Sequence, residues 1–227
     1  MEANGKNSRA TKALVLEAAC DVFAREGYHE GTVAKICEAA GANRAAVNYY
    51  FGDKENLYCE VWKHALAAAL EAYPLQPKDG NPHPEERLRI FMRSLLLRAF
   101  DPGPAGRFTR LMAFEITEPQ GFLRGARARV AGLHDAYFES LMRELLGTGT
   151  REEDLVLCRL MVLAPSLGVG LRRFARHARH MPHATFEFDP ERMAERMFDF
   201  ALAGIERLRR DMELREAGVR EDGEGAR

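Results

Sequence analysis

The chain of 227 residues is long enough for two unequal parts that each bury a hydrophobic core. Its composition, 46% hydrophobic and 30% charged with a formal net charge of -1, excludes a disordered or histone-like chain. The longest mainly apolar run, residues 160–171, falls well short of the roughly 18 residues that a membrane span requires, so we expect no transmembrane helix.

Two further features bear on where the protein works and on its chemistry. The first ten residues are polar and lack the apolar stretch of a secretory signal, so the sequence predicts a cytoplasmic protein. The cysteines, Cys20, Cys37, Cys59 and Cys158, form no CxxC pair and have no histidine at metal-finger spacing. We interpret them as reduced side chains packed like small hydrophobes, and we expect no cofactor and no metal.

Helical periodicity appears in nearly every segment and strand signals are scarce, so the chain is predicted to be all-α with about nine helices. The first helix runs from about residue 9 to residue 25, with Leu14, Ala18 and Val22 on one inward stripe. Gly27 is its expected C-terminal stop.

Three helices with clear start signals follow. Thr32 is a favoured N-cap for a second helix, which ends before Gly41. Asn43 caps a short third helix over residues 44–50. Asp53 then opens a long fourth helix that reaches about residue 72.

A stretch rich in proline, glycine and asparagine, residues 74–84, interrupts the pattern. Beyond it, periodicity predicts helices over residues 85–100, 106–117, 122–146, 151–180 and 190–211. The predicted parts are a three-helix N-terminal domain (1–53), a connecting fourth helix (about 54–72), a C-terminal helical bundle (73–212) and a disordered, charged tail (213–227).

The second and third helices and the tight turn between them, residues 32–50, have the layout of a helix-turn-helix. Val47 and Phe51 lie four residues apart and are predicted to pack inward against Ile36 and Leu14. The opposite face then carries Arg44, Ala45, Asn48 and Tyr49.

That outward face suits the major groove of DNA. Arg44 offers a planar fork for guanine or phosphate, and Asn48 can pair with an adenine edge. Lys54 and the backbone amides at the start of the fourth helix form a predicted phosphate anchor. Tyr49 and Tyr50 either donate their hydroxyls to phosphate or pack against neighbouring side chains. The predicted DNA-binding residues are Thr32, Lys35, Ala42, Asn43, Arg44, Ala45, Asn48, Tyr49, Tyr50 and Lys54.

Net charge supports DNA binding only weakly. Through residue 64 the acidic side chains slightly outnumber the basic ones, so attraction to DNA must come from where individual charges lie. Lys6, Arg9 and Lys12 are candidates for a basic N-terminal arm that reaches flanking phosphate or the minor groove. The alternative is a solvated, disordered start.

Gly27 and Tyr28, followed by TVAKICEAAGANRAAVNYYFGDKENLY at residues 32–58, resemble the DNA-binding domain of TetR-family repressors. The resemblance covers about residues 9–62, and the run NYYFGDKENL is its most diagnostic part. The segment 46–51 is also similar to the CecR-like branch, in which histidine is usual at the position of Tyr50. The resemblance implies a homodimer that binds a double-stranded DNA operator, and a C-terminal domain that binds a small-molecule effector and dimerises.

The last two predicted helices are candidates for the dimer interface. Two such helices from each subunit would form a four-helix contact, as the family resemblance implies. Their apolar and small residues are Met193, Met197, Phe200, Ala201, Gly204, Ile205 and Leu208 in the last helix, and Leu155, Cys158, Val162, Gly168 and Gly170 in the preceding one.

We expect a ligand site among the fifth to eighth helices, where methionines and aromatic residues recur at helical spacing, although such residues are more often core. Glu115 and His134 stand among apolar positions. Each is therefore a satisfied buried group, an exposed group or a handle for a polar group of the ligand. The candidate residues are Phe108, Leu111, Met112, Glu115, His134, Tyr137, Phe138, Met161 and Phe174.

Other chemistry receives little support from the sequence. His177, His180 and His183 raise a metal-sensing alternative, but Pro182 ends the helix there, and no cysteine or carboxylate lies at obvious ligand spacing. No GxSxG, HExxH, P-loop or GxGxxG motif is present, so we do not expect an enzyme.

The sequence therefore predicts a transcriptional regulator, and most simply a repressor that a small-molecule ligand releases from a palindromic operator. Ligand binding would shift the fourth helix and spoil the spacing of the paired recognition helices, which is about 34 to 36 Å on successive major grooves. The alternative is an architectural or division-linked DNA-binding protein of the same fold without a small-molecule inducer.

Overall fold

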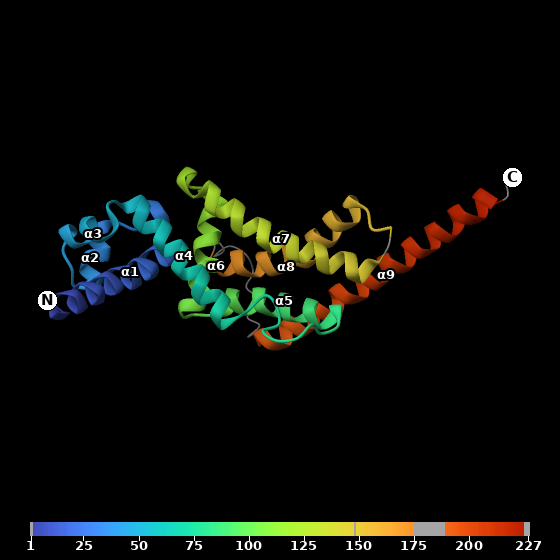
Figure 1. The fold of residues 1–227 in the computed structure, drawn as a ribbon, viewed down its shortest axis with the longest axis horizontal. Helices are drawn as coiled ribbons and strands as arrows, with labels where there is room; N and C mark the ends of the chain where they lie inside the picture. The colour runs from blue at the N-terminus through green and yellow to red at the C-terminus, as the bar shows by residue number, and fades with distance from the viewer. Residues whose placement is uncertain (1, 148, 175–188, 225–227) are drawn as a thin grey trace. The chain divides into compact units, whose positions relative to one another are not determined.

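The computed structural model describes residues 2–147, 149–174 and 189–224, which form nine α-helices and one short 3-10 helix and contain no strand (Figure 1). The prediction of an all-α chain is confirmed. The elements are α1 (Glu2–Glu30), α2 (Val33–Ala40), α3 (Arg44–Phe51), α4 (Lys54–Ala72), α5 (Pro84–Phe100), α6 (Pro104–Thr117), η1 (Gly121–Leu123), α7 (Arg124–Leu146), α8 (Glu152–Phe174) and α9 (Pro190–Glu224).

These elements gather into two compact units. The N-terminal unit comprises Met1–Tyr73 and Arg98–Gly125, and the C-terminal unit comprises Pro74–Leu97 and Ala126–Arg227. Helix α6 therefore packs in the same unit as α1 to α4, although the chain between α4 and α6 enters the other unit. Two of the three boundaries fall inside helices, because α5 and α7 each contribute residues to both units.

Local capping fixes the ends of the two short helices. Thr32 Oγ1 accepts a hydrogen bond from the Lys35 amide at 3.3 Å and starts α2. Gly41 ends α2 in the left-handed region, with φ 60° and ψ 32°, which a residue without Cβ adopts at little cost. Asn43 Oδ1 accepts from the Ala46 amide at 2.9 Å and starts α3. The turn between the helices is thus set by local sequence alone.

The core of the N-terminal unit uses a different stripe of α1 from the predicted one. Val15 is fully buried, whereas Leu14 is 59% exposed, so the prediction that Leu14 lies on the inward stripe is wrong. Ala18 and Val22 are buried as expected. A shift of one residue turns a helix face by about 100°, so Val15 rather than Leu14 continues the stripe of Ala18, Ala19 and Val22.

The outermost helices extend beyond their predicted ends. Helix α1 begins at Glu2 rather than near residue 9, and Gly27, with φ 77° and ψ -176°, breaks it close to the predicted stop. Helix α9 continues to Glu224, so most of the tail that was predicted to be disordered from residue 213 is helical. Ion pairs four residues apart, Arg207–Asp211 and Arg209–Glu213, support the helix at this point.

The C-terminal unit is a bundle of α5, α7, α8 and α9 around one apolar core. Phe91 of α5 and Phe138 of α7 lie at its centre, with ring centroids 5.8 Å apart. Arginines of α5 pair with carboxylates of the other helices: Arg87 with Glu144 of α7, Arg89 with Glu195 and Arg93 with Glu191 of α9. Leu88, Leu141 and Met142 are also fully buried in this core.

Candidate nucleic-acid interface

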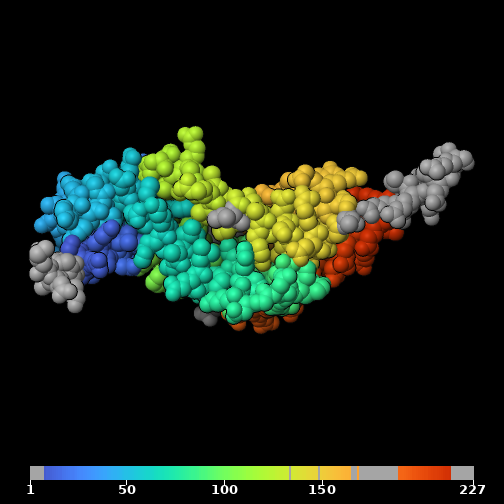
Figure 2. All heavy atoms as spheres, in the orientation of Figure 1, coloured from blue at the N-terminus to red at the C-terminus, as the bar shows by residue number. Residues whose placement is uncertain are grey.

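Helix α3 separates an inward apolar face from an outward polar one. Val47 is fully buried and Phe51 is 7% exposed, and both are inward as predicted. Tyr49, in contrast, is 80% exposed. The outward residues Arg44, Ala45 and Asn48 are exposed too. Helix α3 belongs to the light-blue part of the surface in Figure 2. A guanidinium, an amide and a phenol on one short exposed helix can reach base edges and phosphates together.

Some of the predicted DNA-binding residues also shape the turn. The oxygens of Thr32 and Asn43 accept the capping hydrogen bonds of α2 and α3, so each side chain is held at the start of a helix. The Thr32 hydroxyl proton and the Asn43 amide protons remain available as donors. Ala42, between the two helices, is half-buried.

Two predicted phosphate anchors hold contacts inside the N-terminal unit. Lys35 Nζ donates to Glu26 at 2.7 Å and to the Glu30 carbonyl at 3.0 Å. Lys54 Nζ lies 4.4 Å from the centroid of the Tyr28 ring and donates to the His29 carbonyl at 3.4 Å. Partial burial lowers the pKa of Lys54 and outweighs the opposing effect of Glu30. The role of both lysines on DNA stays a prediction.

Tyr50 differs from Tyr49 in its surroundings. Tyr50 is half-buried, and its hydroxyl lies 3.0 Å from Ser8 Oγ on α1. The two tyrosine rings meet edge to face, with centroids 5.0 Å apart. Tyr49 is thus the tyrosine of α3 that faces outward, and Tyr50 ties α3 to α1.

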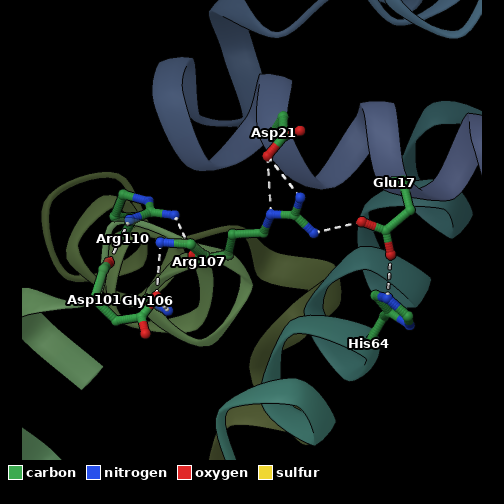
Figure 3. Close-up of polar contacts among 8 residues, drawn as sticks. Glu17, Asp21, His64, Asp101, Gly106, Arg107 and Arg110 are labelled. Carbon is green, nitrogen blue, oxygen red and sulfur yellow. Dashed lines mark hydrogen bonds and ion pairs between the residues drawn. The ribbon is translucent and has the colours of Figure 1, made fainter. Parts of the chain in front are cut away.

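A polar cluster joins α6 to α1 and α4, and sequence reasoning missed it. Arg107 of α6 donates to Glu17 at 2.6 Å and to Asp21 at 2.9 Å, both on α1 (Figure 3). Glu17 also accepts from His64 of α4, at 2.7 Å if that ring nitrogen carries a proton. Partial burial alone would raise the pKa of Glu17, but the hydrogen bonds and charges of Arg107 and His64 lower it. We call these four residues the Arg107 cluster.

The apolar side of α6 packs beside the same helices. The Phe108 ring meets Trp62 of α4 edge to face at 4.9 Å, and Leu111 is fully buried. Glu115, 3% exposed, accepts hydrogen bonds from the Tyr58 hydroxyl at 3.2 Å and from the Gln120 amide at 3.0 Å. Of the alternatives for Glu115, the structure shows the satisfied buried group.

A tight turn leads into α6. Asp101 Oδ1 accepts from the amides of Gly103 at 2.7 Å and Gly106 at 3.3 Å, and its other oxygen accepts from the Tyr73 hydroxyl at 3.0 Å. Arg110 donates to the Asp101 carbonyl at 3.1 Å (Figure 3). A Cβ atom on Gly106 would lie 1.9 Å from that carbonyl oxygen, so only glycine fits there.

The predicted ligand residues divide between the two units. Phe108, Leu111, Met112 and Glu115 lie on α6 in the N-terminal unit, with Met112 half-buried. In the C-terminal unit, Phe138 is 1% exposed, His134 and Tyr137 are half-buried, and Met161 is 65% exposed. The side chain of Phe174 lies outside the described residues. Ligand contact by any of them stays a prediction.

The described residues add three findings on other chemistry. Burial raises the pKa of Cys20 to about 12 and that of Cys158 to about 11, in keeping with thiols packed as small hydrophobes. Among the described residues, no helix is long and apolar enough to cross a membrane, and no group of side chains suits a metal ion. The string His177, His180 and His183 lies outside them.

Comparison with known proteins agrees with the position of the helix-turn-helix. Residues 15–61 match the family model for bacterial regulatory proteins of the tetR family. Residues 84–205 match the model for the C-terminal domain of the HTH-type transcriptional dual regulator CecR.

Similar individual proteins are also transcriptional regulators by name. The chain is 38% identical over 79 residues to the HTH-type transcriptional regulator RutR of Escherichia coli K12, which is 32% of this chain and 37% of RutR. It is 37% identical over 62 residues to the HTH-type transcriptional repressor NicS of Pseudomonas putida, 27% of this chain and 29% of NicS. These matches thus span about a third of each relative.

Among solved structures, the regulator FadR of Bacillus subtilis in complex with stearoyl-CoA has a TM-score of 0.63 and 17% identity, over 85% of this chain and 98% of that chain. At this identity the likeness concerns the fold. The CecR C-terminal model covers more than half of the chain, and the tetR model covers α2 and α3. The chain therefore belongs to the TetR family of bacterial transcriptional regulators.

Proposed function

We propose that the protein is a homodimeric repressor that binds a palindromic operator through α3 and leaves it when a small molecule binds. The observation that carries the proposal is the outward face of α3, where Arg44, Asn48 and Tyr49 are exposed beside the buried Val47 and Phe51. This arrangement supports insertion of α3 into the major groove, with Arg44 and Asn48 at base edges.

The charge distribution supports the same interface. Several carboxylates of the N-terminal unit are already paired: Glu26 with Lys35, and Glu17 and Asp21 with Arg107. Arg44 has no ion pair among the described side chains, so its charge is free for DNA. The slight excess of acidic residues in this part of the sequence therefore repels DNA less than the number of charged residues implies.

Ligand binding would belong to the C-terminal unit. The buried polar atoms there without a hydrogen-bond partner among the described residues include Tyr137 OH and Arg87 Nε. Burial raises the pKa of Tyr137, the nearby Glu144 raises it too, and Arg87 opposes them. An acidic or phosphorylated ligand group would satisfy both atoms. The fold likeness to FadR makes stearoyl-CoA the first probe to test.

The dimer would form through exposed apolar residues of the C-terminal unit. Leu160 and Met161 of α8 are 59% and 65% exposed, and Phe200 of α9 is 81% exposed. Ala201 and Ile205, which the sequence assigned to the interface, are instead buried within the chain. Large apolar side chains left exposed on two helices are a frequent mark of a protein contact.

Replacement of the outward residues of α3 tests the proposal. We expect Arg44→Ala and Asn48→Ala each to weaken operator binding by about 1 to 3 kcal/mol and to relax specificity at one base pair. The operator is first selected from fragmented genomic DNA, and binding is measured by fluorescence anisotropy, then repeated with stearoyl-CoA and other metabolites.

The matched control is Arg25→Ala, which removes an exposed arginine from the C-terminal half of α1. It should bind the selected operator like the wild type. Wild-type protein that selects no sequence, or α3 variants that bind normally, would contradict operator recognition. Specific binding that no metabolite weakens would instead favour the architectural alternative.

A second variant tests the dimer. Phe200→Glu should raise the dimer dissociation constant by at least about thirtyfold, because a charge would replace a large aromatic contact in both subunits (about 2 kcal/mol). Sedimentation velocity over a dilution series measures this constant. Ile116→Glu, at a 51% exposed apolar residue of α6, is the control and should leave it unchanged. An unchanged constant for Phe200→Glu would rule out this face.

A further inference from the structure

The start of α1 lies against the recognition helix, and two side-chain contacts fix it there. Ser8 Oγ is 3.0 Å from the Tyr50 hydroxyl, across 42 residues of sequence. One turn later, Lys12 Nζ lies 5.5 Å from the centroid of the Phe51 ring. Both partners belong to the last turn of α3, so the first turns of α1 are anchored to the end of the helix that would read DNA.

This anchored segment is basic. Residues 1–12 contain Lys6, Arg9 and Lys12 against one acidic residue, Glu2, for a net charge of three minus one, or +2. Arg9 and Lys12 are exposed, and Arg9 has no ion pair among the side chains that the structure describes. The first acidic residue of α1 that pairs with Arg107, Glu17, lies eight residues beyond Arg9, about 12 Å along the helix.

We propose that the first turns of α1 are a second DNA-binding element, which holds backbone phosphates beside the major groove that α3 enters. In this arrangement Arg9 contacts phosphate, and Tyr50 is a positioning residue that holds Ser8, and with it the helix start, against α3. The proposal rests on the proposed operator binding, because it places these phosphates next to the face that carries Asn48 and Tyr49.

Helical order explains why the contact would be effective. A disordered arm loses conformational entropy when it binds, whereas a helix that Tyr50 already holds presents its arginine with less loss. Contact with phosphate carries no base information, so the element would strengthen binding to every sequence and set the position of α3 on its site.

The experiment measures salt dependence on two DNA duplexes, the selected operator and a random sequence. The logarithm of the binding constant falls as the logarithm of the salt concentration rises. Arg9→Ala should make this slope shallower by about one for each protomer, equally on both duplexes. Arg9→Lys should restore the slope because it keeps the charge. Lys63→Ala, which removes one positive charge from an exposed side chain of α4, should leave the slope unchanged.

The positioning role has its own test. Ser8→Ala and Tyr50→Phe each remove one partner of the hydrogen bond, and both should make the salt slope shallower. Ser8→Thr keeps the hydroxyl and should leave the slope at the wild-type value. In the Tyr50→Phe background, Arg9→Ala should change the salt slope less than it does in the wild type, because a released helix start no longer holds Arg9 near phosphate. If Tyr50 instead contacted phosphate directly, Tyr50→Phe would change the salt slope and Ser8→Ala would leave it at the wild-type value.

The result that overturns the proposal is a wild-type slope for Arg9→Ala and Ser8→Ala on both duplexes. Hydroxyl-radical footprints of those variants would then protect the same backbone positions as the wild type. This outcome is distinct from failure of the proposed function, in which the operator selection itself yields no preferred sequence. The random duplex still measures phosphate binding in that case.

Discussion

Replacement of Gly106 by alanine should destabilise the protein more than the same change at any other glycine that the structure describes. The added Cβ would lie 1.9 Å from the Asp101 carbonyl oxygen, and a backbone atom cannot move aside as a flexible side chain can. The turn into α6 would have to open, and its hydrogen bonds from Gly103 and Gly106 to Asp101 would be lost. We expect a loss of about 3 kcal/mol, or a melting temperature about 6 to 12 °C lower.

Gly132→Ala is the matched control. Gly132 lies within α7, and a Cβ atom there would meet no heavy atom within 4 Å. Alanine in a helix is more favourable than glycine by up to about 1 kcal/mol, so this variant should be as stable as the wild type or more so. Thermal unfolding followed by circular dichroism distinguishes the two. A Gly106→Ala protein that melts with the wild type would show that the turn adapts freely.

The second large effect is expected for Arg107→Met. This change keeps most of the apolar stem but removes the hydrogen bonds from Arg107 to Glu17 and Asp21. Arg107 itself is 8% exposed, whereas the two carboxylates are about half exposed and partly solvated. We therefore expect a loss of about 2 kcal/mol at neutral pH, less than the roughly 3 to 5 kcal/mol for breaking a fully buried ion pair. Urea unfolding measures the difference.

The Arg107 effect should depend on pH in a defined direction. The folded protein holds the pKa of Glu17 below its ordinary value of 4.5, so the ionised form stabilises the fold. This contribution is fully present above pH 4.5 and is lost as the pH falls through the lowered pKa. The difference in stability between wild type and Arg107→Met should thus stay constant from neutral pH to about pH 5.5 and shrink below about pH 4.5.

Arg143→Met provides the comparison for Arg107→Met. Arg143 also pairs with two carboxylates, Glu139 and Glu152, but all three side chains are exposed. Exposed ion pairs contribute little to stability, so this variant should lose much less than Arg107→Met. Equal losses of stability would mean that the buried position of Arg107, where α6 meets α1, adds nothing to the contribution of its ion pairs.

The helix-turn-helix was predictable because local sequence determines it. Thr32, Gly41 and Asn43 fix the ends of α2 and α3 through contacts with residues a few positions away, and the predicted limits agree with the structure within one residue. The inward side of α3 followed from the spacing of Val47 and Phe51. These signals lie within one or two helical turns, which a single sequence shows directly.

Long-range partners were not predictable in the same way. The contacts of Arg107 span 86 and 90 residues, and nothing near Arg107 in the sequence indicates which carboxylates it meets. The same limit explains α9, where Phe200 is exposed and its neighbour Ala201 is buried. Apolar residues lie on both the buried and the exposed sides of this helix, so periodicity alone does not distinguish the side that packs into the core of its own unit.

The position of the unit boundaries inside α5 and α7 matters for engineered chimeras. A C-terminal part exchanged between relatives by a cut in the loop after α4 would bring the donor's α6 along with it. That foreign helix would then have to fit beside α1 and α4 of the recipient, where Arg107 meets Glu17 and Phe108 meets Trp62 in the native chain. Chimeras should instead retain the recipient's Arg98–Gly125 segment and join the two proteins within α5 and α7. Each junction should add or remove no residue, so that the side chains beyond it keep their positions around the helix axis.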